Sequence, residues 1–182
     1  MPSKHDEIVQ IVDPLYKLEK HRQDATGAMF FLHGLDSSGQ GTKGRFFQEH
    51  FPHISCPDFH GTLVDRLFQL IDLCQGLSNL TLIGSSFGGL MATCYAIRFP
   101  EKVGRLILLA PALNFGEFRP PPEKLQVPAL LVIGKEDTVT PPAKVIPLAQ
   151  QTFARLEIRN EEDDHMLHKT FAAMAWHELF LG

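Results

Sequence analysis

The hexapeptide Gly84-Ser85-Ser86-Phe87-Gly88-Gly89 is the stretch of this sequence that decides the fold. It lies between a short apolar run, residues 80–84 (LTLIG), and a segment of helical character, residues 87–99. Centred on Ser86, it matches the pattern G-x-S-x-G, in which glycines allow a sharp turn from a strand into a helix. A serine at such a turn is strained, with its hydroxyl presented above the sheet. We therefore expect a strand, a tight turn and a helix, with Ser86 as the candidate nucleophile; the alternative is a Gly/Ser turn without chemistry.

Strand-like and helix-like segments alternate along the rest of the chain. Five more short runs resemble strands, namely residues 28–33, 54–59, 105–110, 129–134 and 156–159. Helices are expected over residues 63–74, 87–99, 141–151 and 165–180, the third kinked or shortened by Pro147. This alternation predicts an α/β fold of three layers, with a mostly parallel central sheet of about six to seven strands and helices on both faces.

Length and composition favour one ordinary globular domain over residues 1–182. Of the 182 residues, 44% are hydrophobic and 21% are charged, a composition unlike that of disordered or fibrous chains. The first 27 residues form an N-terminal extension of uncertain structure, whose aliphatic side chains fit a helix or a pair of edge strands. The net charge of −4 argues against a nucleic-acid partner. The sequence says nothing about the oligomeric state.

Cysteine usage and hydropathy bear on location and on metals. The chain has three cysteines and no C-x-x-C pair, which fits neither a disulfide framework nor a zinc site, so a reducing, cytoplasmic location is expected. No apolar run is long enough to span a bilayer, so no membrane partner is expected. The acidic run at residues 161–164 could suggest a cation site, but we expect a solvated loop. Residues 39–44 fail the phosphate-loop pattern. We expect no metal and no cofactor.

A nucleophilic serine needs a base and a third group that orients the base. Asp137 follows the run 129–134, at the strand end where open α/β sheets place their ligands. His165 lies just after the run 156–159. We expect Asp137 to be the acid, with Glu136 and Glu117 as alternatives, and His165 to be the base, with His168 as the alternative.

The order Ser86, Asp137, His165, together with the G-x-S-x-G motif, resembles the α/β-hydrolase superfamily, and especially its small, lidless, YqiA-like bacterial esterases. In those proteins a His-Gly dipeptide closes an early strand, and the next residue donates a backbone N–H to the oxyanion hole. Here the corresponding tripeptide is His33-Gly34-Leu35. The resemblance implies that the N–H groups of Leu35 and Phe87 form the oxyanion hole. It extends from His33 to about His168 and does not include the N-terminal segment.

The resemblance implies a serine hydrolase that cleaves carboxylic esters or thioesters of small to medium acyl chains through an acyl-enzyme. An acyltransferase, a C–C bond hydrolase and a non-catalytic ligand-binding protein of the same fold are the alternatives. We expect Phe115, Phe118 and Met166, together with His33, to line the substrate pocket, and His33 to form hydrogen bonds behind the oxyanion loop. Relatives often carry a helical lid after the run that ends near residue 110. Only about 18 residues, 111–128, are available here, so we expect no cap domain and an open site.

Overall fold

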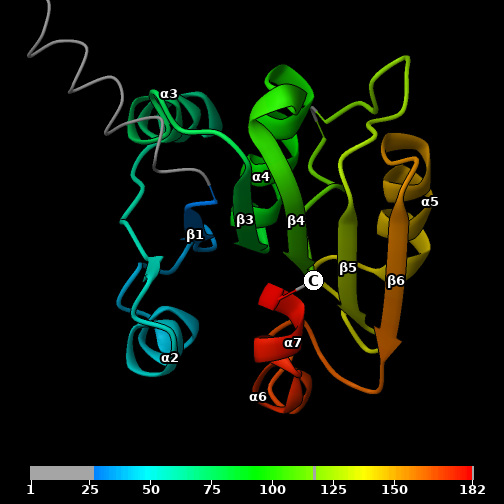
Figure 1. Ribbon diagram of the computed structural model, residues 1–182. Coiled ribbons are helices and arrows are strands. Elements are labelled where there is room, and N and C mark those ends of the chain that lie inside the picture. Colours follow the sequence, from blue (N-terminus) through cyan, green and yellow to red (C-terminus); the bar gives the residue numbers. More distant parts are fainter. Residues whose placement is uncertain (1–26, 117, 182) are drawn as a thin grey trace, which may run out of the picture.

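The computed structural model describes residues 27–116 and 118–181. Its strands form one six-stranded sheet of order β2-β1-β3-β4-β5-β6, in which every neighbouring pair is parallel. The strands are β1 (Met29–Leu32), β2 (Ile54–Ser55), β3 (Leu80–Ser85), β4 (Val103–Leu109), β5 (Ala129–Gly134) and β6 (Leu156–Glu161) (Figure 1). The predicted α/β fold with a parallel sheet is confirmed. The expected N-terminal extension lies outside the described residues, apart from Gly27.

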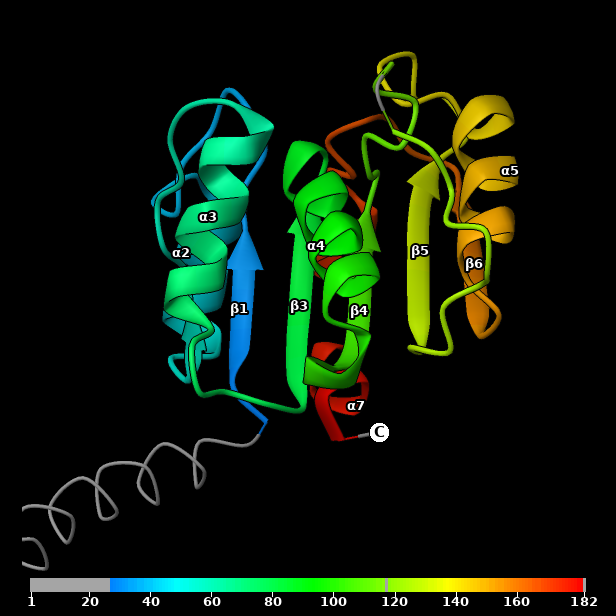
Figure 2. The same ribbon diagram turned by 90° about the horizontal axis from the view of Figure 1, so that it is seen from above.

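Helices cover both faces of the sheet. The helices are α2 (Thr42–His50), α3 (Leu63–Leu73), α4 (Phe87–Arg98), the 3₁₀ turn η1 (Pro100–Lys102), α5 (Pro142–Thr152), α6 (Thr170–Ala173) and α7 (Trp176–Leu181). Figures 1 and 2 show α3, α4 and α5 on one face and α2, α6 and α7 on the other. The result is the three-layer arrangement that the alternating pattern predicts.

Each face of the sheet buries its own core. Leu82 of β3 packs in the core under α3, α4 and α5, whereas its neighbour Ile83 packs in the core next to α2, α6 and α7. In β4, Leu106 packs in the first of these cores and Ile107 packs in the second. Because consecutive strand side chains point to opposite faces, a strand covered on both sides must be apolar throughout. This explains why the central strands read as continuous apolar runs.

The sheet order places the functional loops together. Strand β1 pairs with β2 on one side and with β3 on the other, so the chain changes direction across the sheet between β1 and β3. Ligands of open α/β sheets bind at such a switch point, outside the carboxyl ends of the strands. Residues 33–35 follow β1 there, and Ser86 follows β3.

Three elements differ from the sequence-based predictions. Helix α2 was not predicted, because its region contains Gly41 and Gly44. Strand β2 is two residues long instead of six, and Pro57, which lacks a backbone N–H, follows it. The helix predicted over residues 165–180 is two short helices, α6 and α7, separated by Met174 in an extended conformation (ψ 139°).

Helix α5 runs to Thr152 with Pro147 inside it, so this proline does not shorten the helix, and the other expected effect, a kink, stays a prediction. The connection between β4 and β5 contains no helix in its described part, residues 110–116 and 118–128. In the part of the chain that the structure describes, no cap domain covers the carboxyl edge of the sheet. None of the helices within residues 27–116 and 118–181 combines the length and the apolar character that a membrane crossing requires.

Candidate active site

Ser86 lies at a strained turn between β3 and α4. Its backbone has φ 53° and ψ −115°, a conformation that residues other than glycine rarely adopt. The neighbouring glycines allow close packing, because a Cβ on Gly88 would lie 1.9 Å from the Leu32 carbonyl oxygen and one on Gly84 would lie 2.4 Å from the Gly88 carbonyl oxygen. The G-x-S-x-G spacing thus reflects direct contact between the turn and strand β1.

His165 lies between Ser86 and Asp137. Its Nε2 is 3.1 Å from Ser86 Oγ, and its Nδ1 is 2.8 Å from Asp137 Oδ2. Since a carboxylate only accepts hydrogen bonds, the contact with Asp137 assigns the imidazole proton to Nδ1. Nε2 is then free to accept the Ser86 hydroxyl proton. The three residues predicted from the sequence therefore meet in one hydrogen-bonded chain.

Both carboxylate oxygens of the buried Asp137 are satisfied. Oδ1 accepts the backbone N–H groups of Val139, at 2.9 Å, and Thr140, at 2.7 Å. Oδ2 accepts the Thr140 hydroxyl at 2.5 Å in addition to His165. Thr140 was missed by the sequence analysis. The available signal was the turn after Asp137, in which an aspartate typically binds backbone N–H groups two and three residues later.

The loop that carries His165 is fixed at both sides. Asp163 Oδ2 accepts the N–H groups of Lys169, at 3.0 Å, and Thr170, at 2.8 Å, and its Oδ1 accepts that of Asp164 at 2.9 Å. Desolvation by itself would raise the pKa of the Asp163 carboxyl, but the hydrogen bonds from Thr170, Asp164 and Lys169 outweigh it and lower the pKa to about 2.

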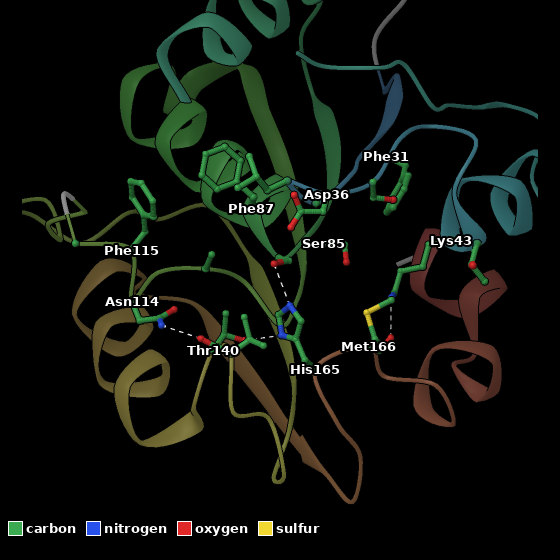
Figure 3. A pocket seen from close by; sticks show the side chains of 18 residues that line it. Phe31, Asp36, Lys43, Ser85, Phe87, Asn114, Phe115, Thr140, His165 and Met166 are labelled. Atoms are coloured by element: carbon green, nitrogen blue, oxygen red, sulfur yellow. Dashed lines mark hydrogen bonds between the residues drawn. The ribbon is translucent and has the colours of Figure 1, made fainter. Parts of the chain in front are cut away.

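On the other side of this loop, Lys43 Nζ of α2 donates to the Met166 carbonyl oxygen at 2.7 Å (Figure 3). Desolvation lowers the pKa of Lys43, while the charges of Asp164 and Asp163 oppose that change. The residue next to the His165 base is thereby tied to α2.

Leu35 and Phe87, whose backbone N–H groups are the predicted oxyanion donors, line the same cavity as Ser86. Within the part of the chain that the structure describes, neither N–H has a hydrogen-bond partner. Two free donors next to a candidate nucleophile are what an oxyanion hole requires.

His33 lies behind the oxyanion loop. The Phe59 N–H donates to His33 Nε2 at 2.9 Å, so the imidazole proton is on Nδ1, which lies 2.7 Å from the Gly34 carbonyl oxygen. Burial is the main cause that lowers the pKa of His33. The buried ring does not line the pocket, which corrects the expectation that it contacts substrate, whereas the expected hydrogen bonds behind the loop are present.

The cavity above Ser86 has a volume of about 650 Å³. In Figure 3, Phe87 and Phe115 lie on one side of His165, and Lys43 and Met166 lie on the other. Its lining residues are Phe31, Gly34, Leu35, Asp36, Ser37, Thr42, Lys43, Ser85, Ser86, Phe87, Ala112, Asn114, Phe115, Gly116, Val139, Thr140, His165 and Met166. Phe115 and Met166 thus occupy the expected positions. Phe118 does not, because it is buried in the core under α4 and α5.

Glu136 and His168, the alternative acid and base within the described residues, do not join this chain of hydrogen bonds. Glu136 is exposed, and its neighbour Asp137 is the residue that contacts His165. His168 is also exposed, with its Nδ1 3.0 Å from Asp164 Oδ2. Glu117 lies outside the described residues. Within residues 27–116 and 118–181, no group of three or more His, Cys, Asp or Glu side chains is arranged to hold a metal ion.

Comparison with known sequences gives a family and several relatives. A family model described as alpha/beta hydrolase fold matches residues 30–124. A 1-acylglycerol-3-phosphate O-acyltransferase of Arabidopsis thaliana is 35% identical over 92 residues, which cover 49% of this chain and 20% of that protein. A human (lyso)-N-acylphosphatidylethanolamine lipase is 39% identical over 54 residues, covering 26% of this chain and 16% of the lipase. The matches thus span a fifth or less of the length of these two relatives.

Comparison with solved structures gives matches along most of the chain. A protein of Xanthomonas campestris pv. campestris assigned to the alpha/beta hydrolase superfamily superposes with a TM-score of 0.69 and 26% identity, covering 85% of this chain and 97% of that one. The superposition thus includes nearly the whole of that protein.

Proposed function

The chain belongs to the α/β hydrolase fold family, and from this membership we propose that it is a serine hydrolase that cleaves carboxylic esters or thioesters through an acyl-enzyme. The observation that carries the proposal is the position of His165, with Nε2 3.1 Å from Ser86 Oγ and Nδ1 2.8 Å from Asp137 Oδ2. A nucleophile, a base and an orienting acid at hydrogen-bond distances support covalent acyl transfer.

Acylation begins when Ser86 Oγ attacks the acyl carbon. His165 Nε2 takes the hydroxyl proton, and the buried Asp137 carboxylate stabilises the imidazolium that forms. The carbonyl oxygen becomes an oxyanion, which accepts hydrogen bonds from the Leu35 and Phe87 N–H groups. When the tetrahedral intermediate collapses, the bond to the leaving oxygen or sulfur breaks, and Nε2 gives its proton to the departing alcohol or thiol.

Deacylation repeats these steps with water as the nucleophile. His165 Nε2 removes a proton from a water molecule that attacks the acyl carbon, and the oxyanion forms again at the same donors. Collapse breaks the bond to Ser86 Oγ, which recovers its proton from Nε2 as the carboxylic acid leaves. The His165 side chain is 18% exposed and no cap covers it in the described part of the chain, so water can reach this atom.

The pocket supports an uncharged acyl chain of small to medium length. Four of its lining residues, Leu35, Phe115, Val139 and Met166, are large hydrophobic side chains exposed at the surface. A cavity of about 650 Å³ is within the usual range for small-molecule sites, which are mostly apolar with a few placed polar groups.

Activity-based labelling tests the proposal directly. We expect a fluorophosphonate probe to modify the wild-type protein at Ser86, as mapped by peptide mass spectrometry, and not to modify the Ser86→Ala variant. A series of p-nitrophenyl esters of increasing chain length should show hydrolysis with an optimum at short to medium chains. Folded protein that the probe does not label would refute the catalytic assignment and favour a ligand-binding role.

Transfer to an alcohol acceptor uses the same residues, and the Arabidopsis relative is named as an acyltransferase. Product analysis with lysophospholipid and glycerol acceptors present separates the two reactions. Release of free acid in the presence of acceptor supports hydrolysis, whereas an acylated acceptor as the main product refutes it.

A further inference from the structure

Arg66 is a buried arginine that the reaction scheme does not yet use. It lies in the first turn of α3, and only 4% of its surface is exposed to solvent. A capping box formed by Thr62 and Asp65 fixes the start of this helix. Arginines are rarely buried this completely unless all of their donors have partners. Two of the three Arg66 nitrogens donate to the backbone of the loop after β1.

The guanidinium binds both peptide groups that flank Leu35. Its Nη1 donates to the Gly34 carbonyl oxygen at 3.3 Å, and its Nη2 donates to the Leu35 carbonyl oxygen at 3.2 Å. Nε donates to the Gly61 carbonyl oxygen at 3.3 Å, which holds the side chain against its own helix start. One planar group therefore fixes two successive carbonyls.

Fixing the Gly34 carbonyl also fixes the Leu35 N–H. The two groups belong to one planar trans peptide, in which the C=O and the N–H point in opposite directions. Two donors, Arg66 Nη1 and His33 Nδ1, bind this carbonyl oxygen, so the Leu35 N–H points away from both of them. Hydrogen bonds to a peptide oxygen also polarise the peptide and make its N–H a stronger donor.

Arg66 also contacts the residue that carries the second donor. Its guanidinium carbon lies 5.3 Å from the centroid of the Phe87 ring, within the range of a cation–π interaction. The Phe87 N–H is the other free donor beside Ser86. A single side chain thus touches the segments that carry both candidate oxyanion donors, although Leu35 and Phe87 follow different strands.

We infer that Arg66 is the positioning residue of the oxyanion hole, which holds the Leu35 and Phe87 N–H groups at the place where the acyl oxygen becomes charged. The inference rests on the proposed function, because it assigns a role in that reaction. Arg66 restricts the conformational freedom of the two donors before substrate binds. Because the oxyanion forms only in the reaction, this restriction stabilises the transition state and leaves substrate binding nearly unchanged.

The test compares Arg66→Met, which keeps the length of the side chain and removes its donors, with Arg66→Lys, which keeps a charge but loses the planar fork. Arg98→Met is the matched control, since the Arg98 guanidinium lies 5.2 Å from the Phe99 ring at the far end of α4. Steady-state hydrolysis of p-nitrophenyl butyrate gives kcat and KM. One inhibitor is an alkyl trifluoromethyl ketone, whose serine adduct carries an oxyanion. Its affinity is compared with that of the secondary alcohol that has the same alkyl chain and a methyl group in place of the trifluoromethyl group, which forms no adduct.

We expect Arg66→Met to lower kcat on the order of 10²-fold, the usual effect of losing one oxyanion donor, with little change in KM. Affinity for the trifluoromethyl ketone should fall by a similar factor, and affinity for the alcohol should stay within about threefold, the scatter of ground-state binding. Arg66→Lys should lose less, and Arg98→Met should match the wild type.

Two results would overturn the inference. One is a normal kcat in Arg66→Met; the other is a low kcat with unchanged ketone affinity, which indicates damage elsewhere. If Arg66→Met shows no cooperative thermal transition, it is not folded. The inference is then tested by kcat and ketone affinity of Arg66→Lys. Failure of the probe to label wild-type Ser86 would refute the proposed function and this inference with it, whereas labelled and active Arg66 variants would refute the inference alone.

Discussion

The Thr140 hydroxyl lies 2.5 Å from Oδ2 of Asp137, the same oxygen that faces His165 Nδ1. Thr140 is 1% exposed, so no water replaces this hydrogen bond if it is lost. The backbone N–H groups of Val139 and Thr140 hold the other oxygen. The carboxylate is therefore fixed in one orientation. Its Oδ1 is held by the backbone, and its Oδ2 contacts the base.

We predict that Thr140→Val lowers kcat on the order of tenfold while KM changes little. Valine has the shape of threonine but cannot donate to Asp137 Oδ2, and a hydrogen bond to a charged group contributes about 1.5–3 kcal/mol. Thr140→Ser keeps the hydroxyl and should retain most of the activity. Steady-state kinetics on one ester for the three proteins checks the prediction. Equal kcat values for the valine variant and the wild type would contradict it.

Asp137→Asn should reduce kcat by about 10⁴-fold with the fold intact. An amide can donate a hydrogen bond to His165 Nδ1, which favours the tautomer with the proton on Nε2, and Nε2 then cannot accept the Ser86 proton. Glu136→Gln is the matched control, because Glu136 is the adjacent residue and is exposed. The control should keep wild-type kinetics. Comparable losses in both variants would show that the acid is not Asp137 alone.

The sequence predicts the parts of the site that depend on local pattern. Ser86 is identifiable because G-x-S-x-G is a pattern of five consecutive residues, and Asp137 and His165 are identifiable because each lies in the loop that follows a predicted strand. Arg66 and Thr140 are different: an arginine on an amphipathic helix and a threonine in a turn are usually exposed. The role of Arg66 comes from tertiary contacts with residues 31 and 32 positions away. Thr140 bonds to a residue only three positions away, but its role depends on the distant His165, which binds the same carboxylate oxygen.

The missed elements have the same explanation. Helix α2 contains Gly44 because a Cβ at that position would lie 1.9 Å from the Gly39 carbonyl oxygen, a contact between segments that local propensity does not reveal. The last predicted helix begins late because Asp163 binds the N–H groups of Lys169 and Thr170, where α6 starts. In both cases a specific contact, which local propensity does not reveal, explains the difference from the predicted helices.

Backbone strain at the nucleophile leads to a prediction about stability. Ser86 has φ 53°, and a residue in such a conformation costs on the order of 1–3 kcal/mol unless it is glycine. Ser86→Gly should therefore be more stable than Ser86→Ala by about 1 kcal/mol, after about 0.4–1 kcal/mol is lost to the greater freedom of unfolded glycine. Both variants lack the nucleophile, so catalysis does not complicate the comparison.

Thermal unfolding of the two inactive variants measures this difference. For a domain of this size, about 1 kcal/mol corresponds to roughly 2–4 °C in Tm. An alanine variant that melts at or above the temperature of the glycine variant would show that the turn stores no strain.

Asp163 gives a prediction about pH. The folded carboxyl has a pKa of about 2, whereas an unfolded aspartate titrates near 3.9. Between these values the unfolded chain binds more protons than the folded chain, so the stabilisation by Asp163 is complete above about pH 4 and is lost as the pH falls towards 2. Asp163→Asn cannot titrate and has one accepting oxygen in place of two.

We expect Asp163→Asn to be less stable than the wild type at pH 7 by about 1 kcal/mol, the usual net contribution of one hydrogen bond, because the amide lacks one of the two accepting oxygens. The difference in Tm between the two proteins should then shrink between about pH 4 and pH 2, because protonation removes the same interaction from the wild type. Glu162→Gln is the matched control, since this neighbouring carboxylate is 76% exposed and its ion pair with Lys135 contributes little. If the wild type and Asp163→Asn kept a constant difference across this range, the charge of Asp163 would not be what stabilises the loop that carries His165.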